Sequence, residues 1–243
     1  MTCLKDLAEQ RRLPDHQVMD QDTLSWIIAN RPTAGAAPDA LPYEPLLLTP
    51  DPAWFRHPRQ ANSIHGIGHN ARVAVLASLL GQEHRLDREE LTALCVAAAV
   101  HDCRRRDDRA DPGHGKRAAR WLSRHGGAVT AAFGLVLPPR QLTSACAAIR
   151  LHDVPREGRT GADRRAYRLA PMLAELLLAA DAMDRYRLPA LRWWPDPAYL
   201  RVTIPEWLPA VAFDLMAVSE QARLDGATHH QALAHALQTL TGQ

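Results

Sequence analysis

Residues 169–185 read LAPMLAELLLAADAMDR, and this stretch decides the fold. Its leucines recur at every fourth position from Leu169 to Leu177 and lead to Asp181, so the spacing predicts a helix with one apolar face. An unpaired carboxylate on such a face costs too much free energy to persist, so we expect Asp181 to meet a cation or several hydrogen-bond donors. The stretch therefore predicts a helical core with a ligand-type side chain directed into it.

Four further segments each begin or end an apolar helical series with a histidine. The apolar series at 73–80 follows His69, and the one at 118–122 follows His114. The apolar runs at 91–100 and 148–149 instead come before His101 and His152. Together with the first stretch, the candidates are His69, the His101-Asp102 doublet, His114, His152 and Asp181. Five helical segments that each direct such a side chain at the core predict a metal site in a helical bundle.

Length and composition are those of an ordinary globular protein. The 243 residues suffice for one good hydrophobic core or two small ones, and the hydrophobic and charged shares are 47% and 23%. A formal net charge of +2 gives no argument for bulk binding of nucleic acid. Arginines do gather at 104–106 and 156–168, and we expect these runs to be solvated unless they border a pocket.

The cysteines and the N-terminus favour a reducing compartment. No CxxC spacing occurs, and Cys95 and Cys146 fall in apolar helical stretches, where a free thiol acts as a small hydrophobe. The first residues, MTCLKDLAEQRRLPDHQ, lack the apolar segment of a signal peptide, and no run approaches the ~18 apolar residues of a membrane span. We therefore expect a cytoplasmic protein with no membrane partner.

The chain divides into an irregular beginning and a helical body. Residues 1–31 predict one or two short helices, and the prolines that recur through 32–63 exclude regular helix there. Further helices are predicted at about 66–81, 87–102, 112–125, 138–152, 166–186, 208–224 and 228–240. Only residues 199–204 are plausible as a strand. We predict an all-α protein in which an extension, residues 1–62, packs on a single helical domain, residues 63–243.

Local signals refine this outline. Asp87, with Glu90 three residues later, predicts a capping box in which the N-cap residue is an aspartate. Gly126-Gly127 predicts a helix end. The polar segment 154–162 and the segment around Trp193-Trp194 are predicted to be loops over a pocket. A tryptophan pair more often plugs a core than binds a ligand, and we favour that role for this one.

The order of the candidate side chains resembles the HD superfamily of metal-dependent phosphohydrolases, whose pattern is H…HD…(H…H)…D. The matching segments are HGIGHNARVAVLASLL (65–80), LCVAAAVHDCRR (94–105), DPGHGKRAARWL (111–122), AIRLHD (148–153) and LLLAADAMDR (176–185). They cover roughly residues 63–186, somewhat over half of the chain. The resemblance implies an HD-domain helical bundle with an irregular proline-rich extension before it.

The resemblance also implies roles for single residues. Those that match the shared metal ligands are His69, His101, Asp102 and Asp181. His114 and His152 match the extra pair of members that hold a second metal ion or bind phosphate. Imidazole and carboxylate donors suit Mn, Fe, Co, Ni or Zn rather than Ca. We therefore expect one or two divalent transition-metal ions.

Two features depart from or add to that pattern. Many HD proteins place a lysine soon after the doublet, whereas this chain has Cys103 followed by Arg104-Arg105-Arg106. Arginine also binds phosphate, and its guanidinium can donate two hydrogen bonds to the phosphate at once. The HGxxHxxR opening resembles the phosphodiesterase domain of bacterial effectors that make phosphoribosyl-linked ubiquitin. There the first histidine, which matches His65, acts in catalysis without a required metal.

The leading hypothesis is a metal-dependent enzyme that hydrolyses a small phosphomonoester or phosphodiester, of nucleotide-like kind. The ion would activate a water molecule, and Asp102 would both bind the ion and orient that water. Further catalytic candidates are His65, His114 and His152, and candidates for binding phosphate are Arg72, Arg105 and Lys116. We expect His65 at the mouth of the pocket, because Gly66 and Gly68 place a loop between it and His69.

Other hypotheses remain open at this point. Some relatives with the same ligand set hold a pair of iron ions and oxidise a C–H bond with O₂, and the ligands here suffice for two ions. A non-catalytic binding module and a metal-independent transesterase that uses His65 are the remaining alternatives. The sequence does not identify the substrate, the metal, the number of ions or the oligomeric state.

Overall fold

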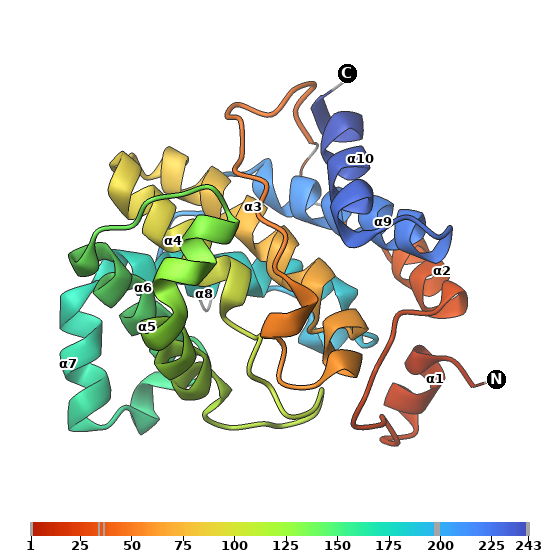
Figure 1. Ribbon diagram of the computed structural model, residues 1–243. Helices are drawn as coiled ribbons and strands as arrows, with labels where there is room; N and C mark the ends of the chain where they lie inside the picture. Colours follow the sequence, from red (N-terminus) through yellow and green to blue (C-terminus); the bar gives the residue numbers. More distant parts are fainter. Residues whose placement is uncertain (1, 34, 36, 197–199, 242–243) are drawn as a thin grey trace.

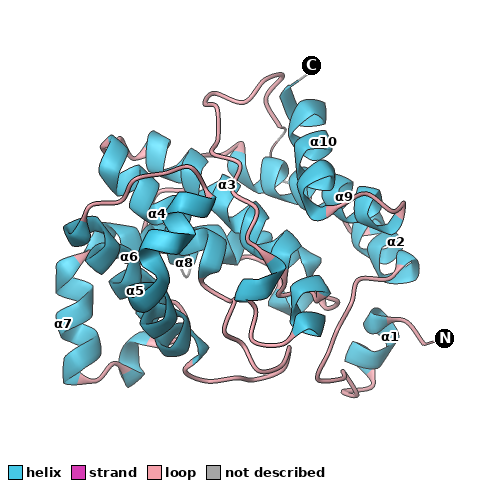
Figure 2. Ribbon diagram, in the orientation of Figure 1, coloured by secondary structure: helices cyan, strands magenta, loops and turns pink. Residues whose placement is uncertain are grey.

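The computed structural model describes residues 2–33, 35, 37–196 and 200–241. Within these residues the chain forms α-helices, short 3₁₀ turns and loops, and no strand (Figure 2). The helices are α1 (Leu4–Glu9), α2 (Gln21–Ala29), α3 (Ile67–Glu83), α4 (Arg88–Val100), α5 (His114–Ala132), α6 (Pro139–Leu151), α7 (Gly161–Leu169), α8 (Pro171–Met183), α9 (Leu208–Leu224) and α10 (His229–Thr241). The prediction of an all-α protein is confirmed.

The helices α3, α4 and α8 form the middle of the bundle (Figure 1). On one side α6 packs against α4 and α8, and α5 and α7 pack against α6. On the other side α9 packs against α3, and α10 and α2 pack against α9. Helices from both halves of the chain therefore enclose one continuous core, which is where the site residues of the middle helices are directed.

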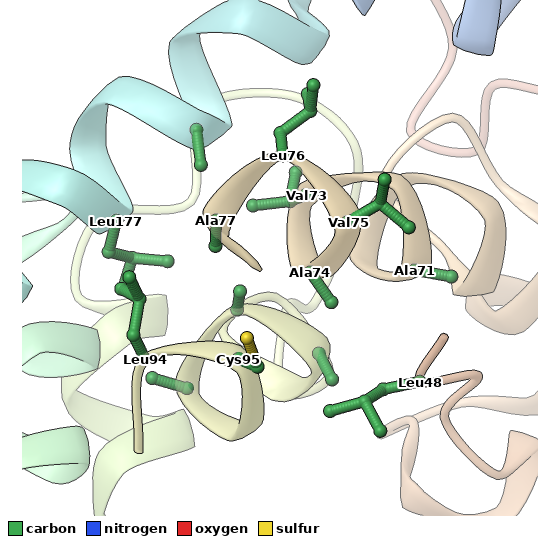
Figure 3. Close-up of a cluster of buried hydrophobic side chains, with 14 of the residues drawn as sticks. Leu48, Ala71, Val73, Ala74, Val75, Leu76, Ala77, Leu94, Cys95 and Leu177 are labelled. Atoms are coloured by element: carbon green, nitrogen blue, oxygen red, sulfur yellow. The ribbon is translucent and has the colours of Figure 1, made fainter. Parts of the chain in front are cut away.

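The contact between α3 and α4 uses small side chains. Figure 3 shows Ala74 and Ala77 of α3 facing Leu94 and Cys95 of α4. All four side chains are completely buried. Small residues allow two helix backbones to approach closely, so the start of α3 and the end of α4 are held in a fixed relation.

The proline-rich segment lies along the body of the bundle. Leu48 is 4% exposed and packs at the edge of the α3–α4 contact (Figure 3). The Leu46 N–H donates to Ser78 Oγ at 3.0 Å, and the Arg56 N–H donates to the Cys103 carbonyl at 3.0 Å. These contacts tie residues 46–56 to α3 and to the loop after α4.

Several predicted boundaries are wrong. The helix predicted at 166–186 is two helices, because Pro171 has no N–H to donate and Ala170 before it leaves the helical region, at φ −150° and ψ 63°. Leu169 belongs to α7 and is 62% exposed, so it does not belong to the leucine series that leads to Asp181. The helix predicted to end at Gly126-Gly127 continues to Ala132 as α5.

Other expectations can be compared directly. The capping box of Asp87 and Glu90 is confirmed at the start of α4. The predicted strand is absent at 200–204, which are loop, and Tyr199 lies outside the described residues. The four cysteines are free thiols. In the described part of the chain, no helix has the length and apolar character needed to cross a bilayer.

Candidate metal centre

Histidines and aspartates from the ends of five helices meet at one place in the structure. His69 lies in the first turn of α3, and His114 is the first residue of α5. The other three come from C-terminal ends: His101 and His152 directly follow α4 and α6, and Asp181 lies in the last turn of α8. Helix ends leave backbone groups without intrahelical partners, so side chains there can be held by the backbone.

Backbone carbonyls hold three of the four imidazole rings. In each, Nδ1 lies 2.7 Å from the carbonyl oxygen three residues earlier: His101 on Ala98, His114 on Asp111 and His152 on Ile149. Nδ1 of His69 instead lies 2.8 Å from Oδ2 of Asp184. Because these oxygens only accept hydrogen bonds, each Nδ1 carries a proton, and a ring in its neutral form presents the lone pair of Nε2 to the centre.

The first group of donors consists of His69, His101, Asp102 and Asp181. Nε2 of His69 lies 3.1 Å from Nε2 of His101, 3.3 Å from Asp181 Oδ1 and 3.6 Å from Asp102 Oδ2. Nε2 of His101 lies 3.7 Å from Asp181 Oδ1 and 4.0 Å from Asp102 Oδ2. The structure therefore brings the four predicted ligands from α3, α4 and α8 together.

The second group shares Asp102 with the first. Nε2 of His114 lies 2.9 Å from Nε2 of His152, and the two nitrogens lie 3.0 and 3.3 Å from Asp102 Oδ1. The other carboxylate oxygen, Oδ2, faces His69 and His101. One carboxylate thus lies between two histidine pairs, with one oxygen toward each pair.

These separations fit metal coordination. Donors about 2.1 Å from one ion lie about 3.0–3.4 Å from each other at tetrahedral or octahedral angles. The closest pairs, His69 with His101 and His114 with His152, have facing lone pairs at 3.1 and 2.9 Å in their neutral forms. Such lone pairs repel unless a proton or a metal ion lies between them. The cluster can therefore hold a metal ion. Among the described residues, the sets of three donors at coordination spacing are His65–His69–Asp102, His69–His101–Asp181 and His101–Asp102–His152.

The charges of the centre favour a cation as well. Although burial opposes ionisation, Arg105 and His114 hold the pKa of the Asp102 carboxyl well below its usual range. The Asp181 side chain is 27% exposed and lines the cavities at the centre, so it is less buried than the sequence predicted. Desolvation opposes its ionisation, but hydrogen bonds from His101 and His69 keep its pKa well below the usual range. Burial lowers the pKa of His101, so this ring is neutral at neutral pH. Two carboxylates and a neutral imidazole are the protonation states that metal ligation requires.

His152 behaves differently from His101. Burial disfavours its charged form, but the hydrogen bond and charge of Asp102 raise the pKa of His152 to about 9. Without a metal ion, His152 is therefore protonated at neutral pH and contacts Asp102 Oδ1 through its Nε2. A metal ion that binds this pair must displace the proton, so the second group binds metal more weakly as the pH falls.

Asp184 fixes His69, and its role was not predicted from the sequence. Its side chain is fully buried, and its carboxylate accepts from Arg72 Nε at 2.6 Å as well as contacting His69. Burial opposes ionisation of Asp184, yet Arg72 and His69 lower its pKa to about 2. The only signal in the sequence was the three-residue spacing from Asp181, which places both carboxylates near one side of α8.

The close approach of α5 to α6 depends on Gly115. A Cβ atom there would lie 2.5 Å from the Ile149 carbonyl oxygen and 2.8 Å from His152 Nδ1. Real Cβ contacts do not come this close, so any larger residue would push the helices apart. Gly115 therefore allows His114 and His152 to meet.

A cavity of about 610 Å³ opens onto the centre. His65 lines it, and His65 Nδ1 lies 3.2 Å from Asp102 Oδ2 and 3.0 Å from Arg187 Nη2. Arg105 lines it too; its Nε and Nη2 donate to backbone carbonyls, while its Nη1 lies 3.5 Å from Asp102 Oδ2. Burial and the charge of Arg105 hold the pKa of His65 well below its usual range, so this ring is neutral.

Two predicted phosphate ligands lie elsewhere. Arg72 is 1% exposed, and its guanidinium contacts Asp184 and Glu220 instead of the cavity. Lys116 lies on α5, 3.4 Å from Asp163, and does not line the cavity. In both cases a carboxylate on a neighbouring element, which the sequence could not place, pairs with the cation.

The predicted loop 154–162 ends at Thr160, because Gly161 begins α7, and it contains the 3₁₀ turn Arg156–Gly158. The two tryptophans separate. Trp194 packs against Tyr186 and Phe213, with ring centroids 5.4 and 6.1 Å away, which is the role of a core plug. Trp193 lines the cavity at the metal centre. The pair therefore fills both roles that the sequence left open.

Comparison of this chain with protein-family models, with curated proteins and with solved structures gives no match. What the centre binds and does must therefore be inferred from its own side chains. Their chemistry is specific: four imidazoles and two carboxylates, held by helix ends at coordination spacing beside an arginine-lined cavity.

Proposed function

We propose that this protein is a metal-dependent phosphohydrolase that acts on a small phosphate ester. The observation that carries the proposal is the position of Asp102, one carboxylate between two histidine pairs at the wall of a cavity. The order of these residues in the sequence, which resembles HD-type phosphohydrolases, supports the same conclusion. A divalent ion at this centre supplies Lewis acidity, which polarises a phosphoryl oxygen and makes a bound water acidic near neutral pH.

The chain's own residues would position the ester. His69, His101, Asp102 and Asp181 hold the ion, and the His114–His152 pair holds a second ion or a phosphate oxygen. Two backbone carbonyls fix Arg105, and its Nη1 lies 3.3 Å from His114 Nε2 and 3.5 Å from Asp102 Oδ2. When His114 binds an ion or a substrate oxygen, Nη1 can donate to a phosphate oxygen beside Asp102. Preorganised donors of this kind stabilise the charge that develops during phosphoryl transfer.

We assign His65 to the substrate rather than to the ion, although it also lies at coordination spacing from His69 and Asp102. The His65 Nδ1 contacts both Arg187 Nη2 and Asp102 Oδ2, which leaves Nε2 for the substrate. Nε2 can exchange a hydrogen bond or a proton with a substrate oxygen. We expect His65→Ala to keep its metal and to lose at least about tenfold in turnover. If the variant lost its metal, His65 would be a ligand of the ion. If its turnover were unchanged, His65 would have only a structural role.

The proposal is tested with a panel of phosphate esters. Protein purified without chelators or nickel resin should hydrolyse p-nitrophenyl phosphate or bis(p-nitrophenyl) phosphate, lose this activity on chelation and regain it with one of Mn, Fe, Co, Ni or Zn. His101→Ala should remove the activity, and the matched control His57→Ala, at an exposed histidine, should not. Failure to hydrolyse any ester with every ion, combined with O₂ uptake by the iron form, would favour the di-iron oxygenase.

A further inference from the structure

A second cavity, of about 440 Å³, also borders the metal centre. It is formed by the loop that follows α6, by the last turns of α8 and by Leu200-Arg201. Both cavities are lined by His152, Asp153, Asp181 and Arg185. The ligands of the candidate centre therefore border two adjoining cavities.

Arg159 is the unusual residue of this second cavity. It is 9% exposed, and within the described part of the chain its Nε and Nη2 have no hydrogen-bond partner and its guanidinium has no ion pair. A buried donor without a partner costs about 1–3 kcal/mol, and more when it is charged. Native proteins rarely keep such a group unless something else satisfies it.

The surroundings of Arg159 leave its donors for a ligand. The Arg159 Cζ lies over the Tyr167 ring, 4.8 Å from its centroid. A cation–π contact uses none of the hydrogen-bond donors of the guanidinium. Its planar fork of N–H groups, a geometry that matches phosphate, is therefore left for a ligand.

The other charges of the cavity do not neutralise Arg159. Glu175 pairs with Arg156, and Asp181 contacts the histidines of the centre. Arg185 and Arg201 also line the cavity, and neither forms an ion pair with a described residue. The cavity is also lined by the carboxylates of Asp153 and Glu157, and neither forms an ion pair with Arg159 in the described chain. Its charge is therefore mixed, and its distinguishing feature is the unpartnered donors of Arg159.

We propose that Arg159 receives a second anionic group of the substrate, a phosphate, while the ester that is cleaved lies at the metal centre. The substrate is then a phosphodiester, because each of its two arms enters one cavity and the arm toward Arg159 bears a further phosphate. A simple monoester would need only one of the two spaces. This inference rests on the proposed hydrolase function for the identity of the substrate, but the anion site itself does not.

The anion site is tested first without metal, with inorganic phosphate as the probe. The melting temperature of chelated wild-type protein should rise with phosphate, and that of Arg159→Met should rise less. Because the variant removes an unpaired buried cation, it should be at least as stable as wild type in phosphate-free buffer. An equal response to phosphate in both proteins, or a variant that is less stable in the absence of phosphate, would overturn the assignment.

The substrate is tested second, with dithymidine monophosphate that carries or lacks a terminal phosphate. For wild-type protein, kcat/KM should be at least about tenfold higher for the phosphorylated dinucleotide. One hydrogen bond to a charged group contributes enough free energy for a ratio of this size. Arg159→Met should lose most of this preference, Arg159→Lys should keep part of it, and Arg168→Met, a matched exposed arginine on α7, should keep it fully.

The two tests fail in different ways. If neither dinucleotide is cleaved but the phosphate response depends on Arg159, the anion site stands and the spanning diester is refuted. If both are cleaved with the same preference in wild type and Arg159→Met, the hydrolase stands and the role of Arg159 is refuted.

Discussion

The two histidine pairs of the centre are built alike but surrounded differently. His69 and His101 are at most 1% exposed, and Asp181 and the buried Asp184 stand beside them. His114 and His152 are 8% and 9% exposed, and the carboxylate they share with the first pair is Asp102.

Because more anionic ligands and a drier site strengthen metal binding, the first group should bind an ion tightly and the second should bind one weakly or serve the substrate. The comparison teaches that a symmetrical set of ligands in the sequence can form two unequal sites. It also gives a ranked series of tests.

The largest effect is expected for the residue that the two groups share. Asp102→Ala removes a ligand from both groups and leaves His69, His101 and Asp181 as the remaining carboxylate-bearing set, so metal content should fall well below that of the wild type. Elemental analysis of the purified variant measures this directly. Asp39→Ala, at an exposed aspartate, is the control. Metal content equal to that of the wild type in Asp102→Ala would remove Asp102 from the centre.

Separate loss of the two groups comes next. His69→Ala should lose the tightly bound ion, whereas His152→Ala should keep it and lose only a second, weaker one. Titration of each metal-free variant with Mn or Zn, followed by calorimetry, gives the number of sites and their affinities. Two variants with the same stoichiometry and affinities would show that the groups are not distinct.

The carboxylate behind His69 should affect the first group alone. Asp184→Asn weakens the contact that orients the ring, and we expect metal affinity to drop about 10–100-fold. Glu220→Gln is the matched control, because Glu220 is the other carboxylate on Arg72 and does not contact His69. Both variants should be less stable, but a similar loss of metal affinity in both would show that Asp184 acts only through stability.

The smallest effect should come from the contact that brings the second pair together. Gly115→Ala forces α5 away from α6, so we expect a loss of about 1–3 kcal/mol in the free energy of unfolding and weaker binding at His114–His152. Gly127→Ala, on the same helix, meets nothing within 4 Å and should gain roughly 0.5–1 kcal/mol. Denaturant unfolding measures the stability of both variants. Equal stability of Gly115→Ala and Gly127→Ala would contradict the role of Gly115.

The sequence predicted the ligands better than their surroundings. Periodicity and helix ends sufficed to select His69, His101 and Asp181, because a polar side chain at the end of an apolar series has few alternatives to a buried partner. The break before α8 was also readable in Pro171, but the leucine spacing across it suggested one continuous helix.

What the sequence could not predict depends on packing between distant elements. Arg72 faces α9 and pairs with Glu220, a residue far away in the chain, so its spacing from His69 was misleading. The role of Gly115 requires the position of the α6 carbonyls, and that of Arg159 requires the absence of a partner among the described residues. Neither is encoded in a local pattern.

Metal content is the most direct test of the central claim, that buried histidine and aspartate side chains form a metal centre. The protein should be purified without chelators or nickel resin, incubated with Mn, Fe, Co, Ni or Zn, desalted and measured by elemental analysis and thermal melting. The account predicts at least about one ion per chain and a melting temperature that falls on chelation. A chain that retains no ion from any of these metals, with a melting curve indifferent to chelator, would contradict it.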